Sequence, residues 1–147
     1  MVNRRTELIV LNTLSNPTGT VLRRRVLRAI ADIAEDNDLF VLSDETYERL
    51  VFDVEHSSIA RLRGMARRTI TVSGFSNTYA MTGRLLGWMI APARIIDAMG
   101  RLQKHTTACV PALIQKGGGC CTPGFSEILK GDDERSEKKQ EDRGQGS

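Results

Sequence analysis

Polar side chains that could bind a ligand follow two predicted strands where each strand ends. Asp44 comes directly after the buried stretch 39–43, and Tyr47 stands three residues later. Asn16 follows the buried stretch 7–13, in an Asn-Pro-Thr-Gly turn. Ligands of open α/β sheets bind at the carboxyl ends of the strands. A carboxylate, a phenol and an amide that offers an NH₂ donor therefore predict a polar binding site at this edge.

Each of these residues also has a plainer explanation. Asp44 could cap the helical turn expected at 45–49, because aspartate is a favoured N-cap residue. The Asn-Pro-Thr-Gly stretch around Asn16 could be a turn and nothing more. Taken alone, the position of Asp44 favours the cap over a ligand.

A third segment is the most specific. Residues 76–87 read Ser-Asn-Thr-Tyr-Ala-Met-Thr-Gly-Arg-Leu-Leu-Gly. Together with Ser-Asn-Pro-Thr-Gly at 15–19 and Ser-Asp-Glu-Thr-Tyr at 43–47, they make the chain resemble the class I/II aminotransferases. These are fold-type I enzymes that use pyridoxal 5′-phosphate (PLP). The resemblance covers about residues 6–116 and only the middle of the longer family chains, so we expect a central fragment of the aspartate/alanine aminotransferase-like type.

The resemblance implies a role for five residues. Asp44 would pair with the pyridine nitrogen of PLP and keep it protonated, so that the ring accepts electrons. Tyr47 and Asn16 would donate hydrogen bonds to the 3′ oxygen. Ser76 and Arg84 complete the cofactor-binding candidates. Arg84 precedes by one residue the position of the family's phosphate-binding arginine, so it would reach the phosphate from a loop but not from a strand.

Asn77 stands where the family has the lysine that forms the imine with PLP. An amide nitrogen is not a nucleophile, and it cannot take the proton from the substrate's α-carbon. Lys104 is the nearest lysine in the sequence, and we do not expect it to substitute. Intact relatives would transfer an amino group between an amino acid and a 2-oxo acid. We expect this chain to have no catalytic residue of its own and to be inactive alone.

Strands that alternate with helices predict an α/β fold with a mostly parallel sheet. This corresponds to part of the large domain of the fold-type I transferases. The fourth strand follows the third after a link too short for a parallel crossover, so it is expected to run antiparallel. The expected strands are 7–13, 39–43, 69–73 and 86–91.

Two helices are predicted between and after these strands. The first, at 22–36, has apolar positions that favour one buried face, namely Leu22, Val26, Ala29, Ile30 and Ile33. The second, at 93–105, would turn Ile95, Ile96, Met99 and Leu102 inward, and a further helix could begin at 110–115.

The pattern ends near residue 117. We therefore expect a partial PLP-binding domain at 1–116 and a disordered tail at 117–147. After Lys130 the tail has almost no apolar residue and crowds charges of both signs, so it cannot bury enough surface to fold. The loss of pattern also suggests a truncated or frameshifted copy of a longer gene.

Composition excludes little else. The formal net charge is +3, which does not indicate a nucleic-acid-binding protein. The arginines at 23–28 could form an anion-binding patch, but a solvated helix face explains them better. No apolar run is long enough to span a membrane, and a cytoplasmic setting fits three cysteines without zinc or disulfide spacing. No metal site is expected, and His56 and His105 are expected to be surface or hydrogen-bonded histidines.

Two functions remain open. The chain could be an inactive fragment of a PLP-dependent aminotransferase. Alternatively, it could be a non-catalytic module that pairs with an intact aminotransferase, since the family dimerises through its large domain and the incomplete sheet would leave apolar surface open.

Overall fold

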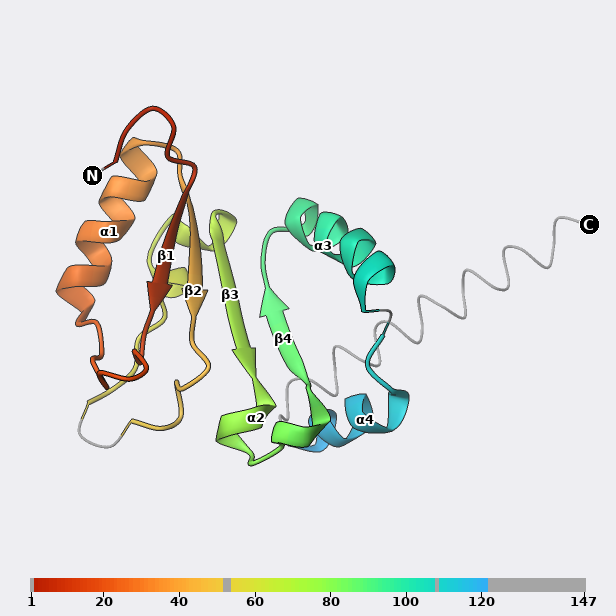
Figure 1. Cartoon of the computed structure of the whole chain (residues 1–147). Coiled ribbons are helices and arrows are strands. Elements are labelled where there is room, and N and C mark those ends of the chain that lie inside the picture. Colours follow the sequence, from red (N-terminus) through yellow and green to blue (C-terminus); the bar gives the residue numbers. More distant parts are fainter. Residues whose placement is uncertain (1, 52–53, 108, 122–147) are drawn as a thin grey trace, which may run out of the picture. The chain divides into compact units, whose positions relative to one another are not determined.

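A computed structural model describes residues 2–51, 54–107 and 109–121. The chain divides into two compact units, Met1–Cys109 and Val110–Ser147. The first unit contains the sheet and all of the residues singled out as candidate ligands (Figure 1).

A four-stranded sheet with the order β1-β2-β3-β4 forms the first unit. β1 pairs in parallel with β2, and β2 in parallel with β3, whereas β4 runs antiparallel to β3. The predicted α/β fold and its antiparallel fourth strand are thus confirmed. The strands are Leu8–Asn12, Phe40–Asp44, Thr69–Gly74 and Gly87–Ile90.

One face of the sheet is covered by α1 (Arg24–Asp36) and by two 3-10 turns, η1 (Ile59–Arg61) and η2 (Met65–Arg67). Because side chains alternate along a strand, Leu11 and Val41 turn toward this layer. The side chains of this core are Leu11, Leu27, Ala31, Ala34, Leu39, Val41, Ile59, Leu62 and Met65.

Of the apolar positions predicted to face inward, Leu22 and Ile30 pack against the core, but the fully buried face of α1 is a different one. Leu27, Ala31 and Ala34 are buried, whereas Val26 and Ile33 are 39% and 42% exposed. Two different sets of apolar residues have the spacing of a helix face. The set that is buried includes two alanines, whose small side chains allow α1 to approach the sheet closely. The prediction that Val26 and Ile33 face inward was therefore wrong.

This helix orientation makes a direct stability prediction at two neighbouring positions. Leu27→Ala removes a fully buried side chain and is expected to lower the free energy of unfolding by about 3 kcal/mol. Val26→Ala, one residue away on the exposed side, is expected to change it by less than about 0.5 kcal/mol. Urea unfolding of both variants measures the difference, and equal losses would contradict the orientation.

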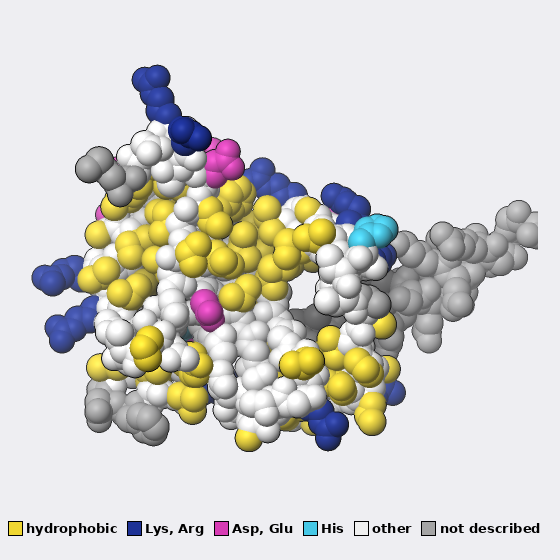
Figure 2. All heavy atoms as spheres, viewed as in Figure 1, with side chains coloured by type: hydrophobic (Ala, Val, Ile, Leu, Met, Phe, Trp, Pro, Cys, Tyr) yellow, Lys and Arg dark blue, Asp and Glu magenta, His cyan; other side chains and the backbone are white. Residues whose placement is uncertain are grey.

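The other face of the sheet is partly exposed within the described part of the first unit, and Arg94, just after β4, lies over the ring of Phe40 on this face at 4.9 Å. Figure 2 shows hydrophobic side chains gathered over the strands. Leu8 and Val10 of β1 are 44% and 63% exposed, and Ile90 of β4 is 65% exposed. Apolar patches of this kind on a protein surface usually mark an interaction site.

The helix after β4 has no buried residue. It is α3 (Ala93–Thr106), and its residues Ile96, Met99 and Leu102 are exposed. The predicted helix is present, but the prediction that these three side chains point inward was wrong. Within the described part of the first unit, this apolar stripe is exposed.

In the second unit the described residues form α4 (Ala112–Cys121). This helix continues five residues past the start of the predicted tail, so 117–121 are helical rather than disordered. The rest of that tail, 122–147, lies outside the described residues, and the division at 116 stays a prediction. In the part of the chain that is described, no helix is long and apolar enough to cross a membrane.

Candidate functional site

The carboxyl ends of the three parallel strands meet at one edge of the sheet. Asn12, the last residue of β1, is in register with Asp44, the last residue of β2, and Asp44 is in register with Val72 of β3. Asn16 follows β1 in the next loop, and α2 (Phe75–Thr78) follows β3 directly. The candidate ligands therefore converge on this edge, where ligands bind in this class of fold.

Asn16 and Tyr47 are in direct contact. The Nδ2 atom of Asn16 donates a hydrogen bond of 2.9 Å to the hydroxyl oxygen of Tyr47, although the residues are 31 positions apart. Since the tyrosine oxygen accepts this bond, its own proton is free to be donated elsewhere. Two donors that meet in this way could both reach one oxygen atom of a ligand, which is the arrangement that the family resemblance implies.

Asp44 caps the turn that follows β2. Its Oδ1 atom accepts hydrogen bonds from the backbone N of Thr46 at 3.1 Å and from the Thr46 hydroxyl at 2.7 Å. Asp44 therefore acts as a cap, which is one of the two explanations given by the sequence. No hydrogen bond is recorded for Oδ2 within the described residues, and this oxygen is the one that could meet a ring nitrogen. That second role stays a prediction.

The segment with Asn77 is tied to the same edge. The hydroxyl of Ser73 donates to the carbonyl oxygen of Glu45 at 3.4 Å, and the hydroxyl of Thr78 donates to that of Thr46 at 3.5 Å. These bonds attach the end of β3 and α2 to the turn after β2. Asn77 is exposed on α2, next to the bonded Thr78.

The phosphate candidates are less well placed. Ser76 is half-buried in α2. Arg84 is exposed and ends a 3-10 turn, η3 (Thr82–Arg84), so it lies outside a strand, as a phosphate contact would require. No contact between Arg84 and the other candidates is recorded, and its phosphate role stays a prediction. Leu85, at the family's arginine position, has a left-handed backbone with φ of 49° and is 83% exposed.

A buried carboxylate next to Asp44 was missed in the sequence. Glu45 is 2% exposed, and its Oε1 accepts hydrogen bonds from the hydroxyls of Ser43 at 2.9 Å and Ser58 at 2.7 Å. The Nε2 atom of His56 lies 3.1 Å from Oε2. His56 is thus a hydrogen-bonded histidine, which the sequence favoured over a catalytic one. Strand alternation was the available signal, because it turns residue 45 away from the face of Asp44.

Hydrogen bonding controls the charge of Glu45. Burial by itself raises the pKa of this carboxyl group. Hydrogen bonds from His56, Ser58 and Ser43, together with the charge of His56, outweigh burial and hold the pKa below its ordinary value of 4.5. Glu45 is therefore ionised at neutral pH. Ligand atoms of Glu45, Glu48 and His56 also lie within 4.8 Å of one another, but hydrogen bonds already occupy both oxygens of Glu45.

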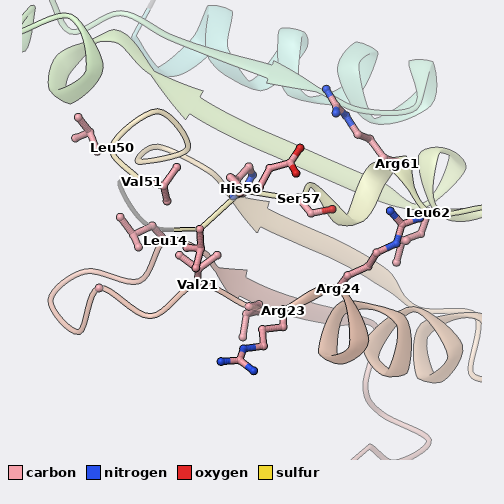
Figure 3. Close-up of a pocket in the computed structure, with 14 residues that line it drawn as sticks. Leu14, Val21, Arg23, Arg24, Leu50, Val51, His56, Ser57, Arg61 and Leu62 are labelled. Atoms are coloured by element: carbon pink, nitrogen blue, oxygen red, sulfur yellow. The ribbon is translucent and has the colours of Figure 1, made fainter.

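A cavity of about 720 Å³ lies beside this network rather than at the candidate ligands. Leu14, Val21 and Val51 line one part of it, and Arg23 and Arg24 line another. Figure 3 shows that the two guanidinium groups point in different directions. They do not converge on one anion, so the cavity does not support an anion-binding function.

The sequence matches known proteins over most of its length. The family model for class I and II aminotransferases covers residues 2–117. The aspartate aminotransferase of Pyrococcus abyssi is 48% identical over 115 residues, which are 78% of this chain and 30% of that protein. Aromatic-amino-acid aminotransferase 2 of Thermococcus litoralis is 47% identical, with the same shares.

Solved structures agree with the sequence matches. The aromatic aminotransferase from Pyrococcus horikoshii superposes with a TM-score of 0.75 at 46% identity, covering 77% of this chain and 31% of that one. N-succinyldiaminopimelate aminotransferase from Mycobacterium tuberculosis gives 0.79 at 32% identity, covering 93% and 37%. The fold is therefore that of the fold-type I transferases. The chain belongs to the class I and II aminotransferase family, whose cofactor is PLP, and it spans about 30% of the length of its curated relatives.

The residues present fit part of this cofactor. The contact between Asn16 and Tyr47 would offer two donors to its 3′ oxygen, and Asp44 would offer a carboxylate to its ring nitrogen. At position 77, where the resemblance predicts a lysine, this chain has an asparagine. The described residues include two lysines, Lys104 on α3 and Lys116 on α4, and no recorded contact links either one to the candidate ligands.

Proposed function

We propose that this chain is a member of the family that retains cofactor-contacting residues but does not transaminate by itself. The observation that carries the proposal is Asn77, at the imine position on a helix hydrogen-bonded to the turn after Asp44. A neutral amide neither forms an imine nor acts as the base, and positioned proton transfer typically contributes about 10²–10⁴-fold to the rate. Transfer of an amino group between an amino acid and a 2-oxo acid is proposed only for intact relatives.

What these residues can still do is hold a ligand without a covalent bond. Asn16 and Tyr47 would orient an oxygen substituent, and the free oxygen of Asp44 would hold a protonated ring nitrogen. When bound, PLP supplies an electron-accepting ring. Among the described residues of this edge, Asn77 stands at the position from which a lysine would move the proton.

Adding PLP to the purified chain tests this proposal. We expect no imine absorbance in the visible range, and no pyridoxyl group on any lysine after borohydride reduction and peptide mass spectrometry. The missing amine is the reason. A stoichiometric adduct, or turnover of amino donors that depends on added PLP, would refute the proposal.

A second candidate function is a non-catalytic partner of an intact aminotransferase. It is supported by the uncovered sheet face, where Val10 is 63% exposed, and by the exposed stripe of α3. Such surfaces favour association because burying apolar area stabilises a complex. Mixing the chain with a full-length relative and measuring molar mass by light scattering should then show a mixed complex. Two separate species at micromolar concentration would rule this candidate out.

A further inference from the structure

Glu45 lies at a junction of three segments. Its side chain binds Ser43 on β2 and both His56 and Ser58 in the segment that leads into η1. Ser43 precedes Tyr47 in the chain, whereas His56 and Ser58 follow it. The carboxylate of Glu45 therefore connects the segment before Tyr47 to the segment after it.

The backbone of Glu45 is held as well. Its N–H donates to the carbonyl oxygen of Val72 at 2.9 Å, which joins it to β3. Its own carbonyl oxygen accepts from the Ser73 hydroxyl at 3.4 Å and from the N–H of Glu48 at 2.9 Å. The residue is thus fixed to the neighbouring strand and to the turn that contains Tyr47.

We propose that Glu45 is a positioning residue that, through His56 and Ser58, holds the turn at 45–48 so that the hydroxyl of Tyr47 meets Asn16. Asp44 and Glu45 point to opposite faces of β2, so one faces the candidate ligand site and the other anchors the turn from behind. The role assigned to Tyr47 rests on the proposed function, whereas the anchoring itself does not.

A carboxylate suits this task better than any neutral side chain. Both serine hydroxyls donate to Oε1, and His56 approaches Oε2, so the site needs acceptors at both oxygens. Glutamine has the same shape but one acceptor oxygen and one NH₂ donor. In Glu45→Gln the NH₂ group must face either the serines or His56, and at least one hydrogen bond is lost or reversed.

Hydrogen exchange of the folded chain tests the anchoring. In Glu45→Gln, amides 46–50 are expected to exchange at least about tenfold faster, while amides 27–34 of α1 keep their rates, because only the anchored turn opens locally. Glu48→Gln is the matched control, because it removes a carboxylate that lies within 4.8 Å of ligand atoms of Glu45 and His56 but makes no side-chain hydrogen bond among the described residues. Ser58→Ala removes one donor to Oε1 of Glu45, together with the acceptor that caps η1 through the N–H of Ala60. It should give a smaller change at 46–50 in the same direction, and it also replaces Glu45→Gln if that variant does not fold.

A second measurement asks whether the anchoring matters to a ligand. Pyridoxamine 5′-phosphate is the probe, because it already carries an amine and needs no lysine, and its own fluorescence reports binding. We expect Glu45→Gln to weaken its binding at least about fivefold and Glu48→Gln to leave it unchanged.

The outcomes distinguish the positioning role of Glu45 from the proposed binding of a cofactor. Unchanged exchange at 46–50, or an equal rise in α1, would overturn the positioning role. A local rise with weaker binding supports it together with the proposed function. A local rise in a chain that binds no pyridoxamine 5′-phosphate in any variant would keep the positioning of Tyr47 and remove the proposed cofactor role.

Discussion

Asn77→Lys is expected to give this chain a visible imine band with PLP and a borohydride-stable pyridoxyl group on residue 77. The expected change is from no adduct to about one per chain, because a primary amine replaces an amide that cannot react. The helix α2 already holds position 77 beside the turn after Asp44, through the bond from Thr78 to Thr46. The new amine would therefore stand at the same edge of the sheet as Asn16, Asp44 and Tyr47.

Thr82→Lys is the control for this experiment. It places a lysine in the same segment, on the exposed η3 turn, and adds the same charge as Asn77→Lys. If both variants gain equal adducts, the aldehyde is reacting with any exposed lysine, and the site has no special role. If Asn77→Lys folds but gains none, the retained residues do not hold PLP, and the proposed ligand role is wrong.

Replacing Glu45 is expected to change how the stability of the fold depends on pH. At pH 7, Glu45→Gln should lower the free energy of unfolding by about 2 kcal/mol, the usual value for hydrogen bonds to a charged group. The pKa of Glu45 is lowered in the folded chain from 4.5, so the folded state binds this proton less readily than the unfolded state. The stability that ionised Glu45 contributes is therefore fully present above pH 4.5 and is lost as pH falls through the folded pKa.

Urea unfolding at a series of pH values measures this effect. Trp88, the single tryptophan, is half-buried in β4 and reports the transition by fluorescence. The difference between the natural chain and Glu45→Gln should shrink as pH falls from 5 toward 3, while Glu48→Gln follows the natural chain throughout. A difference that stays constant over this range would show that the charge of Glu45 does not stabilise the fold.

Much of the fold follows from local sequence pattern. The strands at 39–43 and 69–73 are short apolar runs next to turn residues, and the short link before the fourth strand allows an antiparallel pairing only. The structure confirms these elements within one or two residues. Local pattern could not choose the buried face of α1, because Val26 and Leu27 begin two stripes that are both compatible with a helix. Only the packing partner decides between them.

The candidate site also contains residues that the sequence predicts and residues that it does not. Residue types after strands, together with the family resemblance, predict Asn16, Asp44 and Tyr47 as ligands, and the structure brings Asn16 and Tyr47 into contact. The anchor of Glu45 was not predicted, since His56 and Ser58 reach it from a loop whose path is set by the tertiary structure. Hydrogen bonds between segments distant in sequence leave no periodic trace.

The spatial order of the strands matches their order along the chain, β1 to β4. Leu8 pairs with Phe40 and Val41 with Thr69, so each strand joins the one made just before it. A ribosome would release the strands in this same succession, and no strand would wait for a later neighbour to insert between it and its partner. The described sheet can therefore grow during translation by the addition of each new strand next to the one before it.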